Sequence, residues 1–174
     1  MSDLLEIEQN ILVQDSISIG DGEQYLLFLS GGDIYAVESS SVSEIVEYEE
    51  PTIVPMVSSY IKGVTNIRGN IMGVVDLLDR LSLGSTSVTT KTSYAIVKKR
   101  LDTDNDFSMD IAIMIDEVYE VDYISTADFK DTPEFGAKID KKFISNMATY
   151  KDEYIAVLNI ENLLDISELS SLES

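Results

Sequence analysis

The sequence of 174 residues contains no cysteine, no histidine and no tryptophan. Without cysteine there is no disulfide and no thiol nucleophile, and without histidine neither an imidazole zinc ligand nor a Ser-His-Asp triad is available. Cations are also scarce, because 12 lysine and arginine residues stand against 32 aspartate and glutamate residues, for a net charge of −20. Phosphate binding needs a basic face, so we expect no nucleic-acid partner. These absences exclude most familiar enzyme chemistries.

The N-terminal residues offer neither a basic segment nor a long apolar run. We therefore expect no signal peptide, no direct membrane insertion and a cytoplasmic location. The length suits one compact domain or two small ones in close contact. The acidity itself has two explanations that the sequence leaves open: it serves solubility, or it steers a partner that carries local positive charge.

Short aromatic and β-branched runs, separated by turn residues, predict an all-β protein. Residues 24–30 and 33–38 flank Gly31-Gly32, which predicts a β-hairpin. A second hairpin is expected within residues 62–78, with its turn at Gly69-Asn70. Further strands are expected at residues 94–97, 111–115 and 154–158, beyond a polar link at residues 84–93. Many short strands at regular spacing are typical of small antiparallel barrels.

Two further patterns concern the second hairpin and the C-terminal part. Gly63 and Gly73 lie inside predicted strands, where glycine indicates a bulge or a close approach of another backbone. Asn159 is a suitable N-cap for a helix, whose apolar residues recur at helical spacing. These apolar residues are Ile160, Leu163, Leu164 and Leu172.

The loop Asp102-Thr-Asp-Asn-Asp106 begins like a calcium-binding loop, with acids at the first, third and fifth positions. The sixth position requires glycine and holds Phe107, and the twelfth requires glutamate and holds Ile113. We therefore expect a solvated loop and no bound metal, and nothing else in the sequence indicates a cofactor.

Carboxylate pairs leave one enzymatic alternative, a carboxylate-based hydrolase. Glu44 with Asp76, or Asp116 with Glu117, would supply the general acid and the general base. Such pairs also arise by chance among 32 acids, and Asp116 and Glu117 point to opposite faces if they lie on one strand. We expect no catalytic residues.

Arg68 is one of very few cations in the acid-rich first half of the chain. Two roles, which do not exclude one another, are open for it. It forms a structural ion pair with Asp76 or Glu44, or its guanidinium binds carboxylates or carbonyls of a partner protein.

The segment at residues 60–78, Tyr-Ile-Lys-Gly-Val-Thr-Asn-Ile-Arg-Gly-Asn-Ile-Met-Gly-Val-Val-Asp-Leu-Leu, resembles the signature of the CheW family of chemotaxis coupling proteins. The resemblance extends over roughly residues 24–165, and the central motif is its specific part. The weaker flanking likenesses lie at residues 25–28, 35–37, 42–45, 113–118 and 157–164.

This resemblance implies a fold of two intertwined five-stranded SH3-like β-barrels with a short C-terminal helix. It implies a variable arm at residues 1–23 and one CheW-like domain at residues 24–174. The first barrel is expected at about residues 24–85 together with the returning C-terminal segment, and the second at about residues 86–150.

The resemblance also implies a non-catalytic adaptor without cofactors. CheW proteins couple the cytoplasmic tips of methyl-accepting chemotaxis receptors to the regulatory domain of the histidine kinase CheA, at membrane-associated receptor arrays. The receptor tip is expected in the groove between the barrels, and the kinase at a barrel end. By motif position, the receptor-binding residues are Val42, Glu44, Gly63 and Arg68, and the kinase-binding residues are Val118 and Val121.

The chain departs from the family pattern at three places. The family usually has proline where Gly73 stands, often glycine where Glu117 stands, and a glycine-rich turn near residues 146–150. An added charge at Glu117 near the kinase face is expected to affect partner choice. The chain therefore serves classical chemotaxis or, alternatively, another kinase-linked pathway such as surface motility.

Overall fold

The computed structural model describes residues 22–100, 108–131 and 138–172, and β-strands account for most of them. The predicted all-β class is therefore confirmed. The strands are β1 (Gly22–Ser30), β2 (Asp33–Glu38), β3 (Val42–Glu47), β4 (Ile61–Ile67), β5 (Asn70–Asp76), β6 (Ser93–Arg100), β7 (Ser108–Ile115), β8 (Glu117–Ser125), β9 (Phe129–Lys130), β10 (Ile144–Tyr150) and β11 (Glu153–Leu158). The helical segments are η2 (Ser39–Ser41), α2 (Leu77–Arg80), η3 (Thr126–Asp128), η4 (Lys141–Phe143), α3 (Ile160–Leu163) and η5 (Ser167–Ser171).

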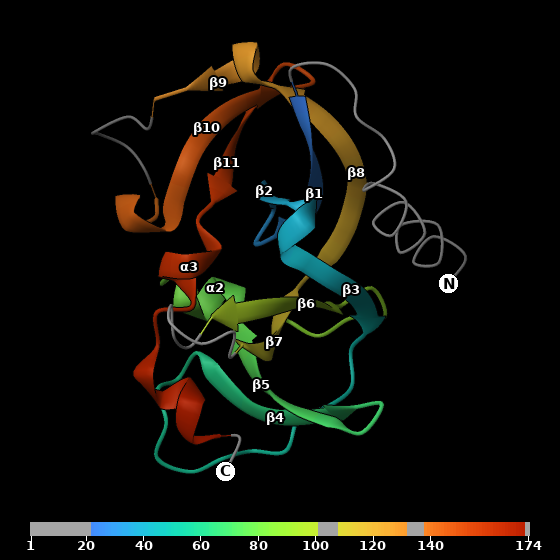
Figure 1. Cartoon of the computed structure of the whole chain (residues 1–174), viewed down its shortest axis with the longest axis vertical. Helices are drawn as coiled ribbons and strands as arrows, with labels where there is room; N and C mark the ends of the chain where they lie inside the picture. The colour runs from blue at the N-terminus through green and yellow to red at the C-terminus, as the bar shows by residue number, and fades with distance from the viewer. Residues whose placement is uncertain (1–21, 101–107, 132–137, 173–174) are drawn as a thin grey trace.

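The strands form two sheets, which occupy the two halves of the molecule in Figure 1. One has the order β8-β1-β2-β11-β10-β9, and the other has the order β3-β6-β7-β5-β4. Each curves into an SH3-like barrel; the first, the six-stranded barrel, gains its sixth strand from the two-residue β9, and the second is the five-stranded barrel. Neither barrel is continuous in sequence, because β3 to β7 are inserted between β2 and β8. The expected division of the chain near residue 85, between a first and a second barrel, stays a prediction.

The five-stranded barrel is closed where the chain leaves β3. Its edge strands are β3 and β4, and Thr52, which follows β3, pairs with Val64 on the free edge of β4. The Thr52 amide donates to the Val64 carbonyl at 2.8 Å, and the Val64 amide donates to the Thr52 carbonyl at 2.9 Å. The edge that β4 would otherwise expose is therefore covered at this point by the protein's own chain.

The six-stranded barrel is held together by polar side chains at its open edge. The Tyr150 hydroxyl, at the end of β10, donates toward two carboxylates of β8, Glu120 and Asp122, with 2.8 Å to Asp122. The Lys151 ammonium adds a 2.8 Å ion pair with Glu120. These contacts join two strands that are not neighbours in the sheet.

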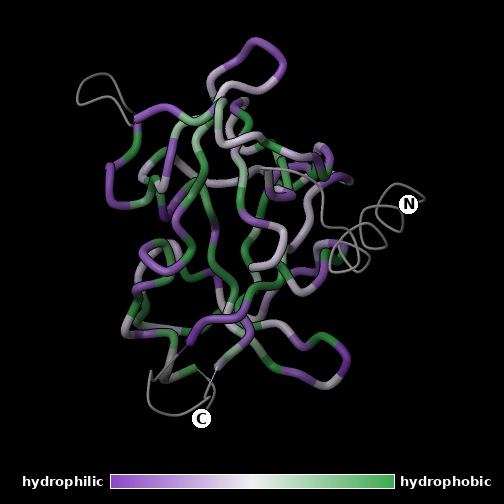
Figure 2. Tube along the Cα trace, turned by 45° about the horizontal axis from the view of Figure 1, so that its top comes forward, coloured by the Kyte–Doolittle hydropathy of each residue, from purple (hydrophilic) through white to green (hydrophobic). Residues whose placement is uncertain are grey.

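Three apolar clusters fill the structure, and the largest lies between the barrels. One contains only residues of the six-stranded sheet, such as Tyr25 and Ile155. Another contains only residues from the five-stranded barrel, such as Tyr94 and Met114. The third joins both sheets with the C-terminal segment. Figure 2 shows hydrophobic stretches along the strands inside the molecule and hydrophilic stretches in loops toward its ends.

The two predicted hairpins are present, but the second turn lies one residue earlier than predicted. Gly31 and Gly32 connect β1 to β2 as expected. The β4–β5 turn is Arg68-Gly69, with φ values of 52° and 87°, and not Gly69-Asn70. Two consecutive positive φ angles are typical of the type I′ turn that suits the twist of a hairpin. Arginine rarely adopts a positive φ, so this register could not be predicted from the residue types at the turn.

The predicted close approach of another backbone is confirmed at Gly63 and is not found at Gly73. Gly63 has a φ of 139°, and a Cβ atom placed there would lie 2.0 Å from the Thr52 carbonyl oxygen. Glycine is therefore required where Thr52 closes the barrel. A Cβ atom on Gly73 would meet only the side chains of Leu169 and Leu172, at 3.3 and 3.0 Å.

The C-terminal helix is capped as predicted but is shorter than the apolar spacing suggested. The Asn159 side chain accepts a 3.0 Å hydrogen bond from the Asn162 amide, yet α3 ends at Leu163. Leu172 lies beyond η5, against Gly73. The carbonyl groups at the end of α3 are satisfied by cations, since Arg80 Nε donates to the Leu163 carbonyl at 2.6 Å and Lys99 donates to that of Leu164.

Candidate partner-binding surfaces

Arg68 and Glu44 form an exposed ion pair at the tip of the β4–β5 hairpin. Arg68 Nη2 lies 2.6 Å from Glu44 Oε2, and the side chains are 70% and 25% exposed. Glu44 comes from β3, so the pair links the two edge strands of the five-stranded barrel. Of the two structural partners expected for Arg68, Glu44 is therefore the correct one. Because most of the guanidinium remains accessible, its donors also remain open to a partner.

Asp76 binds groups other than Arg68, so the prediction that these two residues pair is wrong. Its buried carboxylate accepts from the Leu78 amide at 3.1 Å, from the Thr86 amide at 2.8 Å and from the Thr86 hydroxyl at 2.6 Å. Lys62 lies 4.0 Å from the same carboxylate. Asp76 thus caps α2 and anchors the link at residues 84–93, whose irregular structure was predicted.

The other two residues assigned to receptor binding have little side-chain surface. Val42 begins β3 and is buried in the cluster between the barrels, with 4% of its surface exposed. Gly63 is buried on β4 and adjoins Thr52. Val42 is two residues from Glu44, and Gly63 lies on the strand that leads to Arg68. Val42 and Gly63 therefore influence this surface through the position of their backbone and not through contacts of their own side chains.

Exposed apolar residues gather in the same barrel. Ile53 is 82% exposed and Met56 is fully exposed, on the connector that closes the barrel at Thr52. Ile71, just after the Arg68-Gly69 turn, is also exposed. Large exposed apolar side chains carry an energetic cost in water and are typical of protein–protein contact sites.

The residues expected to bind the kinase lie on β8, an edge strand of the six-stranded barrel. Val118 and Val121 are half-buried against the cluster between the barrels. Tyr119 between them is exposed, and the Lys151 ammonium lies 5.6 Å from its ring centroid. Glu117, at the start of the strand, has its charge offset by Lys91 at 3.3 Å.

The electrostatics of this strand centre on Tyr150. Burial, together with hydrogen bonds to the carboxylates of Glu120 and Asp122, raises the pKa of Tyr150 far above its ordinary value. The hydrogen bond that Lys151 donates to Glu120 likewise raises the pKa of Lys151. Both groups therefore keep their protons at neutral pH, and the contacts that hold β8 to the end of β10 persist across the physiological range.

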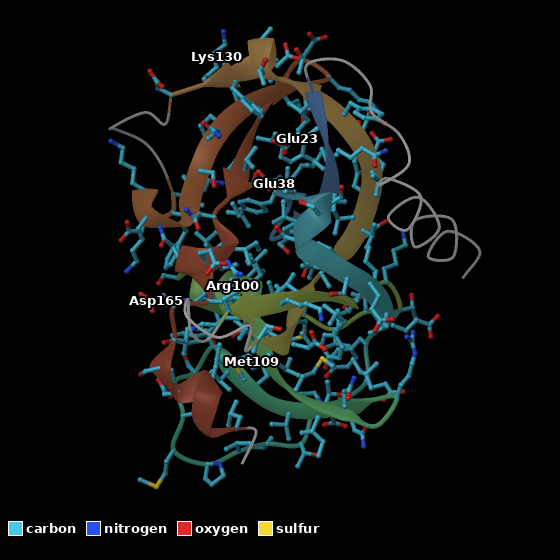
Figure 3. All side chains as sticks on the ribbon, in the orientation of Figure 1. Glu23, Glu38, Arg100, Met109, Lys130 and Asp165 are labelled. Carbon is cyan, nitrogen blue, oxygen red and sulfur yellow. The ribbon has the colours of Figure 1, made fainter. Side chains whose placement is uncertain are left out.

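A polar cleft of about 420 Å³, which we call the inter-barrel cleft, lies between the two barrels. Tyr25 and Glu38 line it from the six-stranded barrel, and Ser43 and Lys98 line it from the five-stranded barrel. Ser40 and Ser41 of η2, the segment that crosses from one barrel to the other, complete this part of the lining. Figure 3 shows Glu38 on the side of its barrel that faces the other barrel, with Lys130 at the far end.

The structure brings together neither of the carboxylate pairs that a hydrolase would need. Glu44 and Asp76 lie on strands separated by β6 and β7, and each has a different partner. Asp116 accepts from the Gly31 amide at 2.8 Å, whereas Glu117 pairs with Lys91. Within the described residues no group of three acidic side chains could hold a metal ion. The loop at residues 102–106 and the arm at residues 1–21 lie outside the described residues.

Sequence reasoning missed Glu38 and Lys98, because each is unremarkable in its own segment. Their proximity arises only when η2 carries the chain from one barrel to the other. It also missed Tyr150 and Lys151, because their partners Glu120 and Asp122 lie far away in the sequence, on β8.

Comparison with known proteins shows which protein family shares this architecture. The family model described as "CheW-like domain" matches residues 24–168. The chain is 27% identical to the chemotaxis protein CheW of Bacillus subtilis, over 84% of this chain and 90% of that protein. It is 26% identical to the chemotaxis protein CheW of Helicobacter pylori, over 81% of each. The crystal structure of the scaffolding protein TtCheW from Thermoanaerobacter tengcongensis superposes with a TM-score of 0.74 and 23% identity, over 86% of this chain and 92% of that one. None of the described helices is long and apolar enough to span a membrane.

Proposed function

The chain belongs to the CheW family, and from this premise we propose that it couples the cytoplasmic tips of chemotaxis receptors to the regulatory domain of the histidine kinase CheA. The family consists of non-catalytic chemotaxis scaffold proteins, so the chain is not an enzyme. The observation that carries the proposal is the family match across residues 24–168, which includes both barrels and the cleft between them.

The receptor side of the proposal rests on Glu44, Arg68 and the inter-barrel cleft. Glu44 and Arg68 form an accessible ion pair that a polar partner can join or exchange. Val42, on the same strand, lies between Ser41 and Ser43, which line the cleft. Gly63 sets the path of β4 toward Arg68 by admitting Thr52 beside it. We assign these four residues to receptor binding, two as contacts and two as positioning residues.

The kinase side of the proposal rests on β8. Val118 and Val121 are half-buried, so their apolar surface is only partly covered in the isolated chain. Burial of exposed Tyr119 with them would supply the apolar centre that protein interfaces have, and Glu120 and Asp122 would contribute to the polar rim. Because this strand belongs to the other barrel from Arg68, one chain would hold both partners at once.

The proposed location follows from these partners. The chain would act in the cytoplasm and be recruited to membrane-associated receptor arrays by binding, without inserting into the bilayer. The strongly acidic surface favours partner faces with local positive charge, mainly through the association rate.

Titration calorimetry with purified components tests the proposal. The full chain is titrated with the regulatory domain of the kinase and, separately, with a receptor tip fragment from the same host. We expect saturable binding of each. If the folded chain binds neither, the coupling function is wrong; if it binds the kinase domain and receptors of a surface-motility pathway alone, the adaptor role holds and the pathway changes.

A further inference from the structure

Three charged side chains line the inter-barrel cleft, Glu38, Lys98 and Glu161 of α3, and none of them forms an ion pair within the described residues. Glu38 ends β2 in the six-stranded barrel, and Lys98 lies on β6 in the five-stranded barrel. The two groups are more than ion-pair distance apart, and within the described residues neither has an ion-pair or hydrogen-bond partner for its charged group. Asp110, opposite Lys98 on β7, does not reach it either.

Lys98 shares this lack of an ion pair with Lys130, Lys141 and Lys142, whereas most other cations of the described residues have a partner. Lys62, Arg68, Lys91, Lys138 and Lys151 each form an ion pair with an acid. Arg80 and Lys99 instead donate to main-chain carbonyl groups of the C-terminal segment. With 32 acids available, a lysine that faces a cleft without a carboxylate partner is available to a group from outside the chain.

Glu38 is disfavoured where it stands. Partial burial raises the pKa of its carboxyl group, and repulsion from Glu23 raises it further. Figure 3 shows Glu23 and Glu38 on the same part of the barrel. Cations from a partner would relieve this repulsion.

The remaining lining suits a polypeptide with polar side chains. The hydroxyl groups of Ser40, Ser41 and Ser43 and the amide of Asn146 both donate and accept hydrogen bonds. Strand β3 connects the cleft with Arg68. Its Ser43 lines the cleft, and the carboxylate of the next residue, Glu44, binds Arg68.

We propose that Glu38 and Lys98 select the receptor tip that enters the cleft: they favour a tip whose basic side chain faces the six-stranded barrel and whose acidic side chain faces the five-stranded barrel. This inference rests on the proposed receptor-coupling function and deepens it. Both charges are exposed enough to be reached, and a partner that presents the opposite arrangement meets repulsion at two points, which is an effective way to reject it.

Binding of a receptor tip fragment to full-length charge variants tests the selection. Glu38→Lys and Lys98→Glu are each expected to weaken binding at least about tenfold. Their matched controls, Asp128→Lys and Lys130→Glu, make the same changes in net charge at exposed positions of η3 and β9, and are expected to stay within about twofold of the original. Affinity for the kinase domain is expected to stay the same in both cleft variants.

Further variants separate recognition from folding. Glu38→Gln is expected to melt at the same temperature as the original or slightly higher, because it removes a disfavoured charge, and yet to bind the tip less tightly. In Lys98→Glu, replacing the matching acidic residue of the tip by lysine is expected to restore binding. Salt between about 50 and about 500 mM should weaken the original complex more than that of a Glu38→Gln/Lys98→Met variant.

The outcomes distinguish this inference from the proposed function. If the original chain binds the tip and both reversals bind it like their controls, the selection by Glu38 and Lys98 is wrong while receptor coupling stands. If the original chain binds the kinase domain but no receptor tip, receptor coupling itself is wrong. Loss of binding in a reversal variant that melts at the original temperature supports the selection.

Discussion

The end of β5 and the inter-barrel cleft use charged residues in opposite ways. At the end of β5, the buried Asp76 carboxylate has three hydrogen-bond donors and a nearby ammonium group. In the cleft, Glu38 and Lys98 are unpaired although both signs of charge are present. A buried charge without partners is strongly destabilising, whereas a partly exposed one costs little. At Asp76 the fold therefore satisfies a charge that it buries, and in the cleft it leaves accessible the charges that a partner can use.

The Arg68–Glu44 pair is intermediate between the buried Asp76, which has several partners, and the cleft residues, which have none. The pair is formed, and it joins the edge strands of a barrel, but most of the Arg68 side chain is exposed to solvent. Exposed ion pairs contribute about 0–1 kcal/mol to stability. Stability measurements on variants can therefore show whether a charged residue serves the fold, as Asp76 does, or is left for a partner, as Glu38 and Lys98 are.

Gly63→Ala is expected to cause the largest loss, about 3 kcal/mol or more of the free energy of unfolding. The new Cβ would lie 2.0 Å from the Thr52 carbonyl oxygen, at a φ of 139° that alanine rarely adopts. Urea denaturation measures the loss. Gly73→Ala is the matched control and should cost less, because its Cβ meets flexible leucine side chains. Equal losses would contradict the structural assignment of Gly63.

Asp76→Ala is expected to cost about 2 kcal/mol, since it removes the cap of α2 and leaves the Thr86 amide without its acceptor. Asp76→Asn keeps one acceptor oxygen and should cost less. Chemical denaturation of both variants, with receptor binding measured below the transition, tests the contrast with the cleft. A stable Asp76→Ala chain that has lost only partner binding would place Asp76 among the functional residues.

Arg68→Glu should change stability by less than about 1 kcal/mol and weaken receptor binding by at least about fivefold. The ion pair becomes a repulsive contact with Glu44, but both side chains can turn toward solvent. Melting temperature and calorimetric affinity are measured on the same sample. A collapse in melting temperature would show that the pair serves the fold, as Asp76 does.

Ser58→Ala is expected to have the smallest effect, and one that depends on pH. The Ser58 amide and hydroxyl donate to the Glu168 carboxylate at 2.7 and 2.6 Å and lower its pKa. A lowered carboxyl pKa stabilises the fold above the unfolded-state value, and that contribution is lost as pH falls through the folded-state value. An NMR titration should show the Glu168 pKa rising toward its ordinary value in the variant. An unchanged pKa would mean that this contact is absent in solution.

Local patterns predicted the first hairpin and the strands β6, β7 and β11, because alternation and turn glycines act within a few residues of each other, but they did not predict β9 or β10. They did not predict the Arg68-Gly69 turn, since a positive φ at arginine is imposed by the strands that it joins. The C-terminal leucine spacing suggested one helix, but Leu172 is drawn to Gly73, a contact that only the folded barrel provides.

The sequence predicted only those features of the candidate sites that depend on residues close together in the chain. Glu44 and Arg68 lie in recognisable segments, and their pairing was one of two alternatives that the sequence left open. The burial of Val42 was not foreseen, because it depends on the contact between the barrels. The cleft combines residues of β1, β2, η2, β3, β6, β10, β11 and α3, so no single segment of the sequence could predict it.

Sedimentation of the full chain with the kinase regulatory domain and the receptor tip fragment together tests the central claim most directly. The claim is that one chain presents separate surfaces on two barrels to two partners. We predict one complex that contains all three components, with the affinity for either partner not reduced by the other. Displacement of the kinase domain by the receptor tip, in a chain that binds each alone, would contradict it.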